Sequence, residues 1–279
     1  MHYGVILLWF ILTALSVAFV AIDIRTTPEA TVMKWGFVLV TLFTGPFGAF
    51  LYVLGCREPL PGMHEAYVAA LWRQALGSAM HCVAGDGIGI LTGAVIAALL
   101  LLSPFADFLL EYVLGLLFGW GIFQALFMRA VIGGSYALSL RSTFIPELTS
   151  MNCLMAGMMV VTMIGKTNVP GGTNPSSPAF WFIMSMGLLV GLCATYPMNY
   201  WLVSRKLKHG MMTVRPKGAT PATTVMPGSS GASGTTSMPA MESHGMDMTP
   251  DVASSTIAFV VVLSFVVLII GVVIGMSFS

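Results

Sequence analysis

The sequence predicts an all-α fold, a polytopic helical membrane bundle of about seven transmembrane helices. Three observations lead to this prediction: 57% of the 279 residues are hydrophobic, only 8% are charged, and the mean hydropathy is +0.89. Soluble domains carry about 25% charged residues. Water cannot solvate a chain this apolar, and its apolar runs approach the roughly 20 residues that cross a bilayer as a helix. The lipid bilayer is therefore the expected partner.

Seven apolar runs mark the expected spans in order, at about 3–24, 35–54, 86–103, 109–132, 150–165, 180–202 and 256–276. Residues 63–82 predict an amphipathic helix at the membrane interface, and the Gly/Ser/Thr/Pro/Met-rich stretch 211–254 predicts a disordered linker. The expected organisation has four parts: two N-terminal spans in 1–62, a four-span domain in 63–211, the linker in 212–254 and a last span in 255–279.

Charge and cysteine usage exclude several classes of protein. The net charge of +1 gives no basis for binding nucleic acid, and the four widely spaced cysteines form neither a disulfide framework nor a zinc-finger pattern. No hydrolase or nucleotide-binding motif is found, so we expect no enzyme. Lysine and arginine gather after the second, fourth and sixth expected spans. They predict a prokaryotic inner-membrane protein with a cytoplasmic N-terminus and an outside C-terminus. Protein partners remain open.

The stretch "MHCVAGDGIG" (80–89) places His81, Cys82 and Asp86 at the mouth of an expected span. Imidazole and thiolate suit copper, zinc or iron. On a continuous helix Cys82 and Asp86 share a face that His81 does not. A break at Gly85 would instead let all three side chains meet around one metal ion. The alternative to a metal site is ordinary helix capping and packing, and the sequence leaves these interpretations open.

Two other patterns, one of glycines and one of methionines, concern how the helices pack. Gly85, Gly89 and Gly93 continue a four-residue spacing that starts at Gly77 and predicts close helix packing. The methionines of the expected fifth span are spaced to fill the space between helices or to pass Cu(I).

The linker carries a third pattern, "SMPAMESHGMDMTP" (237–250). Such methionine and histidine tracts suit weak, exchangeable copper binding. The predicted copper ligands are Met238, Met241, His244, Met246 and Met248.

Four blocks, "HCVAGD", "FIPELTSMNCLMAGM", "FWFIMSMGLLVG" and "YPMNYWLVSRKLKHGM", resemble the bacterial and archaeal domain-of-unknown-function family 4396 over about residues 63–211. The resemblance implies an integral membrane fold and names positions without naming a reaction. Some members are joined to copper-related domains, which points to the same chemistry as the linker. The positions that it marks are His81, Cys82, Gly85, Asp86, Pro197, Asn199, Tyr200, Trp201 and Leu202.

The expected topology brings these blocks to one membrane depth, because His81, Glu147 and Asn199 all lie near the cytoplasmic ends of their spans. The preferred hypothesis is a membrane protein that handles or transports a soft metal, with copper as its cofactor or cargo. The alternative is a non-catalytic scaffold or assembly factor with no metal role. A redox enzyme that uses Cys82 ranks last, since no second thiol is near it in sequence.

Overall fold

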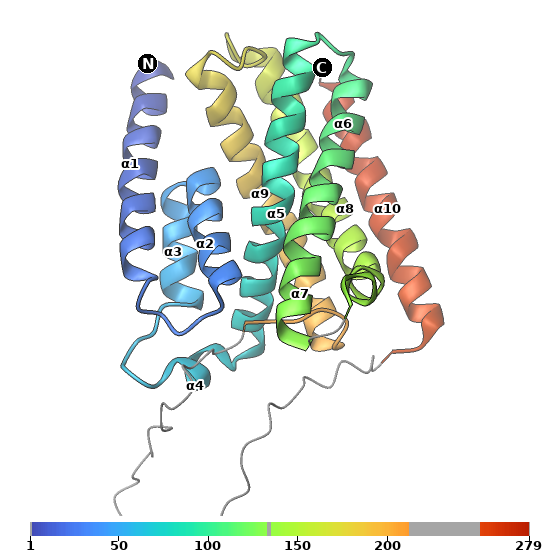
Figure 1. Cartoon of the computed structure of the whole chain (residues 1–279). Coiled ribbons are helices and arrows are strands. Elements are labelled where there is room, and N and C mark those ends of the chain that lie inside the picture. The colour runs from blue at the N-terminus through green and yellow to red at the C-terminus, as the bar shows by residue number, and fades with distance from the viewer. Residues whose placement is uncertain (1, 133–134, 212–251, 279) are drawn as a thin grey trace, which may run out of the picture.

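The computed structural model describes residues 2–132, 135–211 and 252–278, and all its regular elements are helices (Figure 1). The predicted all-helical membrane bundle is confirmed: six helical segments are long and apolar enough to cross a membrane. They are α1 (His2–Asp23), α5 (Leu71–Leu99), the consecutive α6 (Pro104–Leu116), η1 (Leu117–Gln124) and α7 (Ala125–Ile132), then α8 (Tyr136–Asn168), α9 (Pro178–Ser204) and α10 (Ser254–Ser277).

The prediction of a single span over 35–54 is wrong. The chain forms two short helices there, α2 (Thr31–Thr44) and α3 (Pro46–Gly55), which lie side by side next to α1 (Figure 1). Gly45 joins them with φ at +61°, a conformation that favours glycine, and Pro46 starts the new helix. With 14 and 10 residues, neither helix reaches the length of a span.

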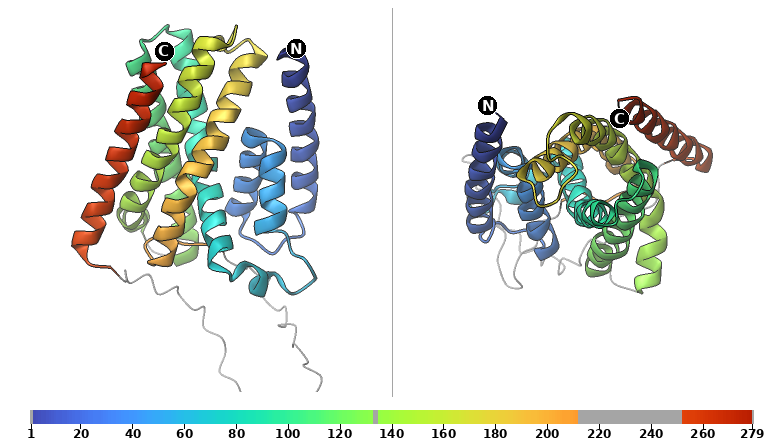
Figure 2. Two further views of the ribbon diagram at one scale, coloured as in Figure 1. Left: turned by 180° about the vertical axis from the view of Figure 1, so that it is seen from behind. Right: turned by 90° about the horizontal axis from the view of Figure 1, so that it is seen from above.

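This hairpin changes the topology. It enters the bundle and returns to the end from which it came, so the described residues form six helical segments long enough to cross a membrane, where the sequence predicted about seven. The start of α1 and the end of α10 therefore lie at the same end of the bundle (Figures 1 and 2). The prediction of one terminus on each side does not fit this arrangement.

Helix α5 replaces the predicted interfacial helix 63–82 and the span 86–103. Within the predicted range 63–82, only the short α4 (His64–Val68) is a separate helix, and α5 runs unbroken through Gly85. The bend that would gather His81, Cys82 and Asp86 is absent.

Glycines bring α5 close to its neighbour. A Cβ on Gly93 would lie 2.8 Å from the Glu111 Cα, one on Gly89 would overlap the Leu114 backbone, and one on Gly85 would lie 2.9 Å from the Gly119 Cα. Helix axes approach this closely only where side chains are missing.

The other spans are longer than the sequence predicted or differ locally. Helix α8 begins at Tyr136, well before the predicted residue 150, and the span 109–132 begins at Pro104. Within the latter, residues Leu117–Gln124 form a wider π-helical segment whose buried residues are Gly119 and Gln124. Such segments are frequent at functional sites.

Residues 205–211, which we name the closing segment, follow α9 and run back across the end of the bundle (Figure 1). Lys206, with φ at +56°, turns the chain, and Lys208, His209 and Met211 are buried. The Met211 side chain packs against Gly77 of α5. This end of the bundle is thereby covered by the chain itself.

Candidate functional site

A carboxyl–thiol cluster lies inside the bundle, where Cys82 and Asp86 of α5 meet Glu147 of α8 and Lys208 of the closing segment. The Cys82 Sγ is 3.2 Å from Asp86 Oδ2 and 3.2 Å from Glu147 Oε1. The Lys208 Nζ donates to Glu147 Oε2 at 2.9 Å. All four side chains are buried, and the sulfur and carboxylate oxygens lie within 4.8 Å of one another. The arrangement can hold one cation.

Helix geometry explains how α5 and α8 present these groups. Cys82 and Asp86 are four residues apart on an unbroken helix and so lie one turn apart on one face. Glu147 follows Pro146 inside α8, and Ser150, three residues later, lies on the same face. The Ser150 hydroxyl is 3.2 Å from the Cys82 sulfur.

A second layer of hydrogen bonds orients Ser150. The Asn199 Nδ2 of α9 donates to Ser150 Oγ at 2.7 Å and to the Thr195 carbonyl at 3.0 Å. Ser78 of α5 donates to Asn199 Oδ1 at 3.4 Å. The amide of the "PMNYW" motif therefore ties α5, α8 and α9 together directly behind the cluster.

Asp86 is the least satisfied member of the cluster. Its Oδ1 atom is buried and has no hydrogen-bond partner among the described residues. It faces Gly119 of the π-helical segment, where a Cβ would overlap Oδ1 and lie 3.1 Å from Glu147 Oε1. The missing side chain of Gly119 thus provides the room that Asp86 Oδ1 occupies next to Glu147.

The closing segment supplies the positive charge. Burial disfavours the Lys208 ammonium, but the acidic groups of Cys82, Glu147 and Asp86 outweigh this effect and raise the pKa of Lys208. Burial and the adjacent Lys208 lower the pKa of His209 to about 3, so His209 is neutral near pH 7. Among the described residues, Lys208 is therefore the cation that contacts the acidic groups of the cluster.

His81, predicted as a metal ligand, lies outside the cluster. Its ring packs against Phe123, Phe127 and His209, with ring centroids 5.8, 5.1 and 5.8 Å away. This is the geometry expected for a continuous helix, on which His81 points about 100° away from Cys82. The predicted linker ligands Met238, Met241, His244, Met246 and Met248 fall outside the described residues.

The remaining motif positions lie outside the carboxyl–thiol cluster. The regularly spaced methionines of α8 are buried in the hydrophobic core: Met151, Met155, Met159 and Met163. Pro197 lies within α9 without ending it, Tyr200 is 40% exposed, and Trp201 lines a cavity.

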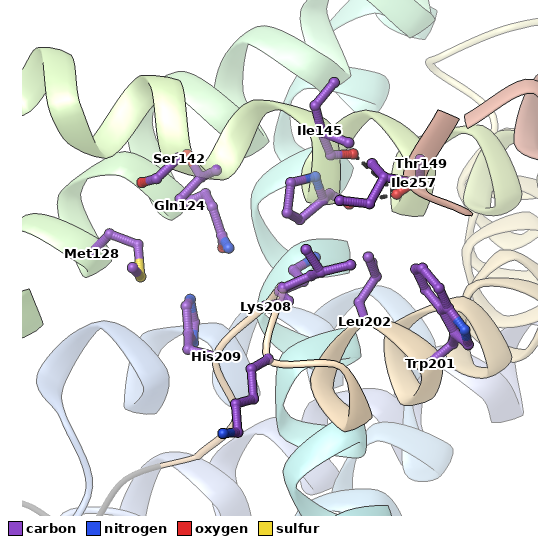
Figure 3. Close-up of a pocket in the computed structure, with 14 residues that line it drawn as sticks. Gln124, Met128, Ser142, Ile145, Thr149, Trp201, Leu202, Lys208, His209 and Ile257 are labelled. Atoms are coloured by element: carbon purple, nitrogen blue, oxygen red, sulfur yellow. Dashed lines mark hydrogen bonds between the residues drawn. The ribbon is translucent and has the colours of Figure 1, made fainter. Parts of the chain in front are cut away.

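That cavity has a volume of about 310 Å³ and lies between the closing segment, η1, α7, α8 and the end of α9 (Figure 3). Gln124, Lys208 and His209 are among its lining side chains, together with Pro146 and Thr149 on either side of Glu147 along the chain. Lys208 therefore lines this cavity and also contacts Glu147 of the cluster through its amine.

Sequence reasoning did not identify Lys208 or Gly119 as part of the site. Lys208 belongs to a basic run, "SRKLKH", that is typical of a cytoplasmic membrane border. Only its burial against Glu147 distinguishes it from its neighbours. Gly119 carries no sequence signal beyond its lack of a side chain.

Comparison with curated proteins and with solved structures gives no match to either. A family described as "Domain of unknown function (DUF4396)" matches residues 71–208. The matched segment starts with α5 and ends at Lys208, so it contains every member of the carboxyl–thiol cluster. The chain is thus a helical membrane protein whose residues 71–208 resemble this family, as its motifs predicted.

Proposed function

We propose that the protein binds a transition-metal cation at Cys82, Asp86 and Glu147 in exchange for protons. The observation that supports this most directly is the charge of the cluster. Two carboxyl groups face a single ammonium group, and all three are buried. An uncompensated charge is costly in a membrane interior. The cluster therefore needs one more positive charge, from a proton or a metal ion.

The proposed exchange balances in charge. Without metal, Asp86 and Glu147 share one proton, Cys82 is a thiol, and the Lys208 ammonium neutralises the remaining negative charge. When a divalent cation binds, the shared proton and the thiol proton leave, and the sulfur and carboxylate oxygens become metal ligands. The cluster is neutral before and after the exchange, and two protons are released for each ion bound.

The donor set indicates the kind of ion. One thiolate and two carboxylates suit a borderline divalent ion such as Zn²⁺, whereas Cu(I) prefers sulfur-rich sets. With His81 turned away, this cluster does not favour copper over zinc. A copper role for this protein would therefore rest on the linker methionines.

We also place the cluster end of the bundle in the cytoplasm. Basic residues at that end outnumber those at the other end, where Lys166 lies near the end of α8. By the positive-inside rule we infer that both chain ends lie outside. The basic residues at the cluster end lie next to the end of α1, the start of α2, the end of α3, the start of α5 and the end of α9: Arg25, Lys34, Arg57, Arg73, Arg205 and Lys206.

The test is a titration of metal into the purified, chelator-stripped protein in detergent, with bound ions and released protons counted together. We expect Zn²⁺ to bind more tightly than Mn²⁺, and Asp86→Asn to bind one Zn²⁺ fewer than the wild type. The matched control is Asp107→Asn, because Asp107 is a carboxylate paired with Lys166 at the other end of the bundle. Equal stoichiometry and affinity in the wild type and Asp86→Asn would contradict the proposal and favour a purely structural cluster.

A further inference from the structure

A second group of metal-ligating side chains lies outside the segment that matches the family. Glu29 comes from the loop between α1 and α2, Cys56 directly follows α3, and His64 starts α4. The Glu29 Oε1 and His64 Nε2 atoms are 3.9 Å apart, and one ligand atom from each residue lies within 4.8 Å of the others. All three residues are buried, with exposed fractions of 5%, 0% and 1%.

We propose that Glu29, Cys56 and His64 form a second metal site, which binds one borderline divalent cation such as Zn²⁺. Carboxylate, thiolate and imidazole are the three side-chain donors that zinc takes in proteins. A tetrahedral zinc ion with bonds of 2.0–2.3 Å needs ligand atoms about 3.3–3.8 Å apart. The 3.9 Å between Glu29 and His64 is already close to this spacing.

Hydrogen bonds hold the segments that carry Glu29 and Cys56 together. Arg57, next to Cys56, forms a two-pronged contact with Asp23 at the end of α1, at 2.9 Å for each nitrogen–oxygen pair. The Tyr52 hydroxyl donates to Asp23 Oδ2 at 2.8 Å and lies 3.0 Å from the Thr27 hydroxyl. The loop that carries Glu29 is therefore fixed against the end of α3.

The segment that carries His64 is fixed in a similar way. The Glu58 carboxylate accepts hydrogen bonds from the Gly62 amide at 2.6 Å and from the His64 amide at 3.3 Å. The Glu29 carboxylate itself accepts one from the Ala30 amide at 3.2 Å. These contacts hold the segments that carry the three proposed ligands in place, and the Ala30 amide also orients the Glu29 carboxylate itself.

Charge and coordination number suggest how this site would behave. A divalent ion with one thiolate, one carboxylate and a neutral imidazole leaves no net charge, which suits a buried position. Three protein ligands leave the fourth tetrahedral position open, which is typical of sites that exchange a ligand. The site lies at the same end of the bundle as the closing segment (Figure 1). It uses no residue of the carboxyl–thiol cluster, so the two proposals stand or fall separately.

Cobalt titration of the full-length protein in detergent tests the proposal, because thiolate-bound Co²⁺ has a charge-transfer absorption that carboxylates and imidazole do not produce. The measurement starts from Cys82→Ser, which removes the thiol of the carboxyl–thiol cluster. We expect one equivalent of Co²⁺ to give the thiolate band in this protein, and Zn²⁺ to displace it. Adding Cys56→Ser should abolish the band, and adding His64→Gln should weaken Co²⁺ binding at least tenfold.

Cys193→Ser is the matched control, because Cys193 is an exposed free thiol of α9, and it should leave the band intact. Elution volume and helical circular dichroism verify folding, and the serine and glutamine replacements preserve side-chain size. Absence of the band in Cys82→Ser, or a band unchanged by Cys56→Ser in folded protein, overturns the second site. A different result would separate the two proposals. If the wild type and Cys82→Ser bind equal numbers of ions, the proposed function of the carboxyl–thiol cluster fails. If the Cys56-dependent band persists in the same experiment, the second site stands.

Discussion

Replacing Lys208 by methionine removes the only ammonium group that the described structure places against the carboxyl–thiol cluster. The Lys208 Nζ lies 2.9 Å from Glu147 Oε2, and both side chains are 0% exposed. Removing one partner of a buried ion pair typically costs 3–5 kcal/mol, because the other charge stays buried without compensation. We expect a destabilisation of about this size for Lys208→Met, and a similar one for Glu147→Gln.

The double variant Lys208→Met/Glu147→Gln separates the ion pair from the loss of either side chain. It removes both charges, so its stability should return to within about 1–2 kcal/mol of the wild type, since replacing a whole buried pair is often close to neutral. Unfolding by a graded increase of denaturing detergent, followed by tryptophan fluorescence, measures all four proteins. Arg205→Met is the matched control, because Arg205 is an exposed basic residue of the same segment, and it should change stability by less than about 0.5 kcal/mol.

Additive effects in this cycle would refute the reasoning. A coupling energy below about 0.5 kcal/mol means that Lys208 and Glu147 do not interact energetically. Lys208 would then owe its burial to the packing of the closing segment alone.

Three further predictions follow from the geometry around the cluster. Gly119→Ala should destabilise the protein by about 1–3 kcal/mol in the same assay, because the added Cβ would overlap Asp86 Oδ1. Gly121→Ala is the control and should not destabilise the protein, since nothing lies within 4 Å of the added Cβ. The free energy of unfolding should fall as the pH drops from about 6.5, the usual pKa of histidine, toward about 3, the pKa of buried His209. In this window the unfolded chain takes up a proton at His209 that the folded protein excludes, which costs up to about 1.4 kcal/mol per pH unit. His209→Phe should flatten this part of the pH profile, and an unchanged slope would contradict the assignment. Reporter domains fused ahead of α1 and after α10 should both report the outside of the cell, and opposite locations would contradict the six-span topology.

The helical membrane bundle could be predicted from the sequence because hydropathy directly reflects the cost of burying polar groups in lipid. The span count could not, because residues 35–54 are as apolar as a true span and only the conformation of Gly45 turns the chain back. The continuous α5 was likewise ambiguous: the glycine spacing favoured a straight helix, and a corner at Gly85 remained equally compatible with the residue types. Packing against the backbone of α6 decides between them.

Part of the candidate site was also accessible from the sequence. The four-residue spacing places Cys82 and Asp86 on one face, and the expected topology brings Glu147 and Asn199 to the same depth. Lys208 was not accessible, because a lysine just after a span is ordinarily at the membrane border. Its burial depends on how the closing segment turns at Lys206, a tertiary feature without a local sequence signal.

The proposed exchange of protons for a metal ion at the carboxyl–thiol cluster can be measured directly. The most direct measurement counts the protons released for each Zn²⁺ bound, in weakly buffered protein near neutral pH. Cys56→Ser protein serves as the starting material, so that this cluster is the remaining proposed site. We predict two protons released for one ion bound, and loss of both signals in Asp86→Asn. Zinc binding that releases no protons, or that survives Asp86→Asn unchanged, would contradict the claim.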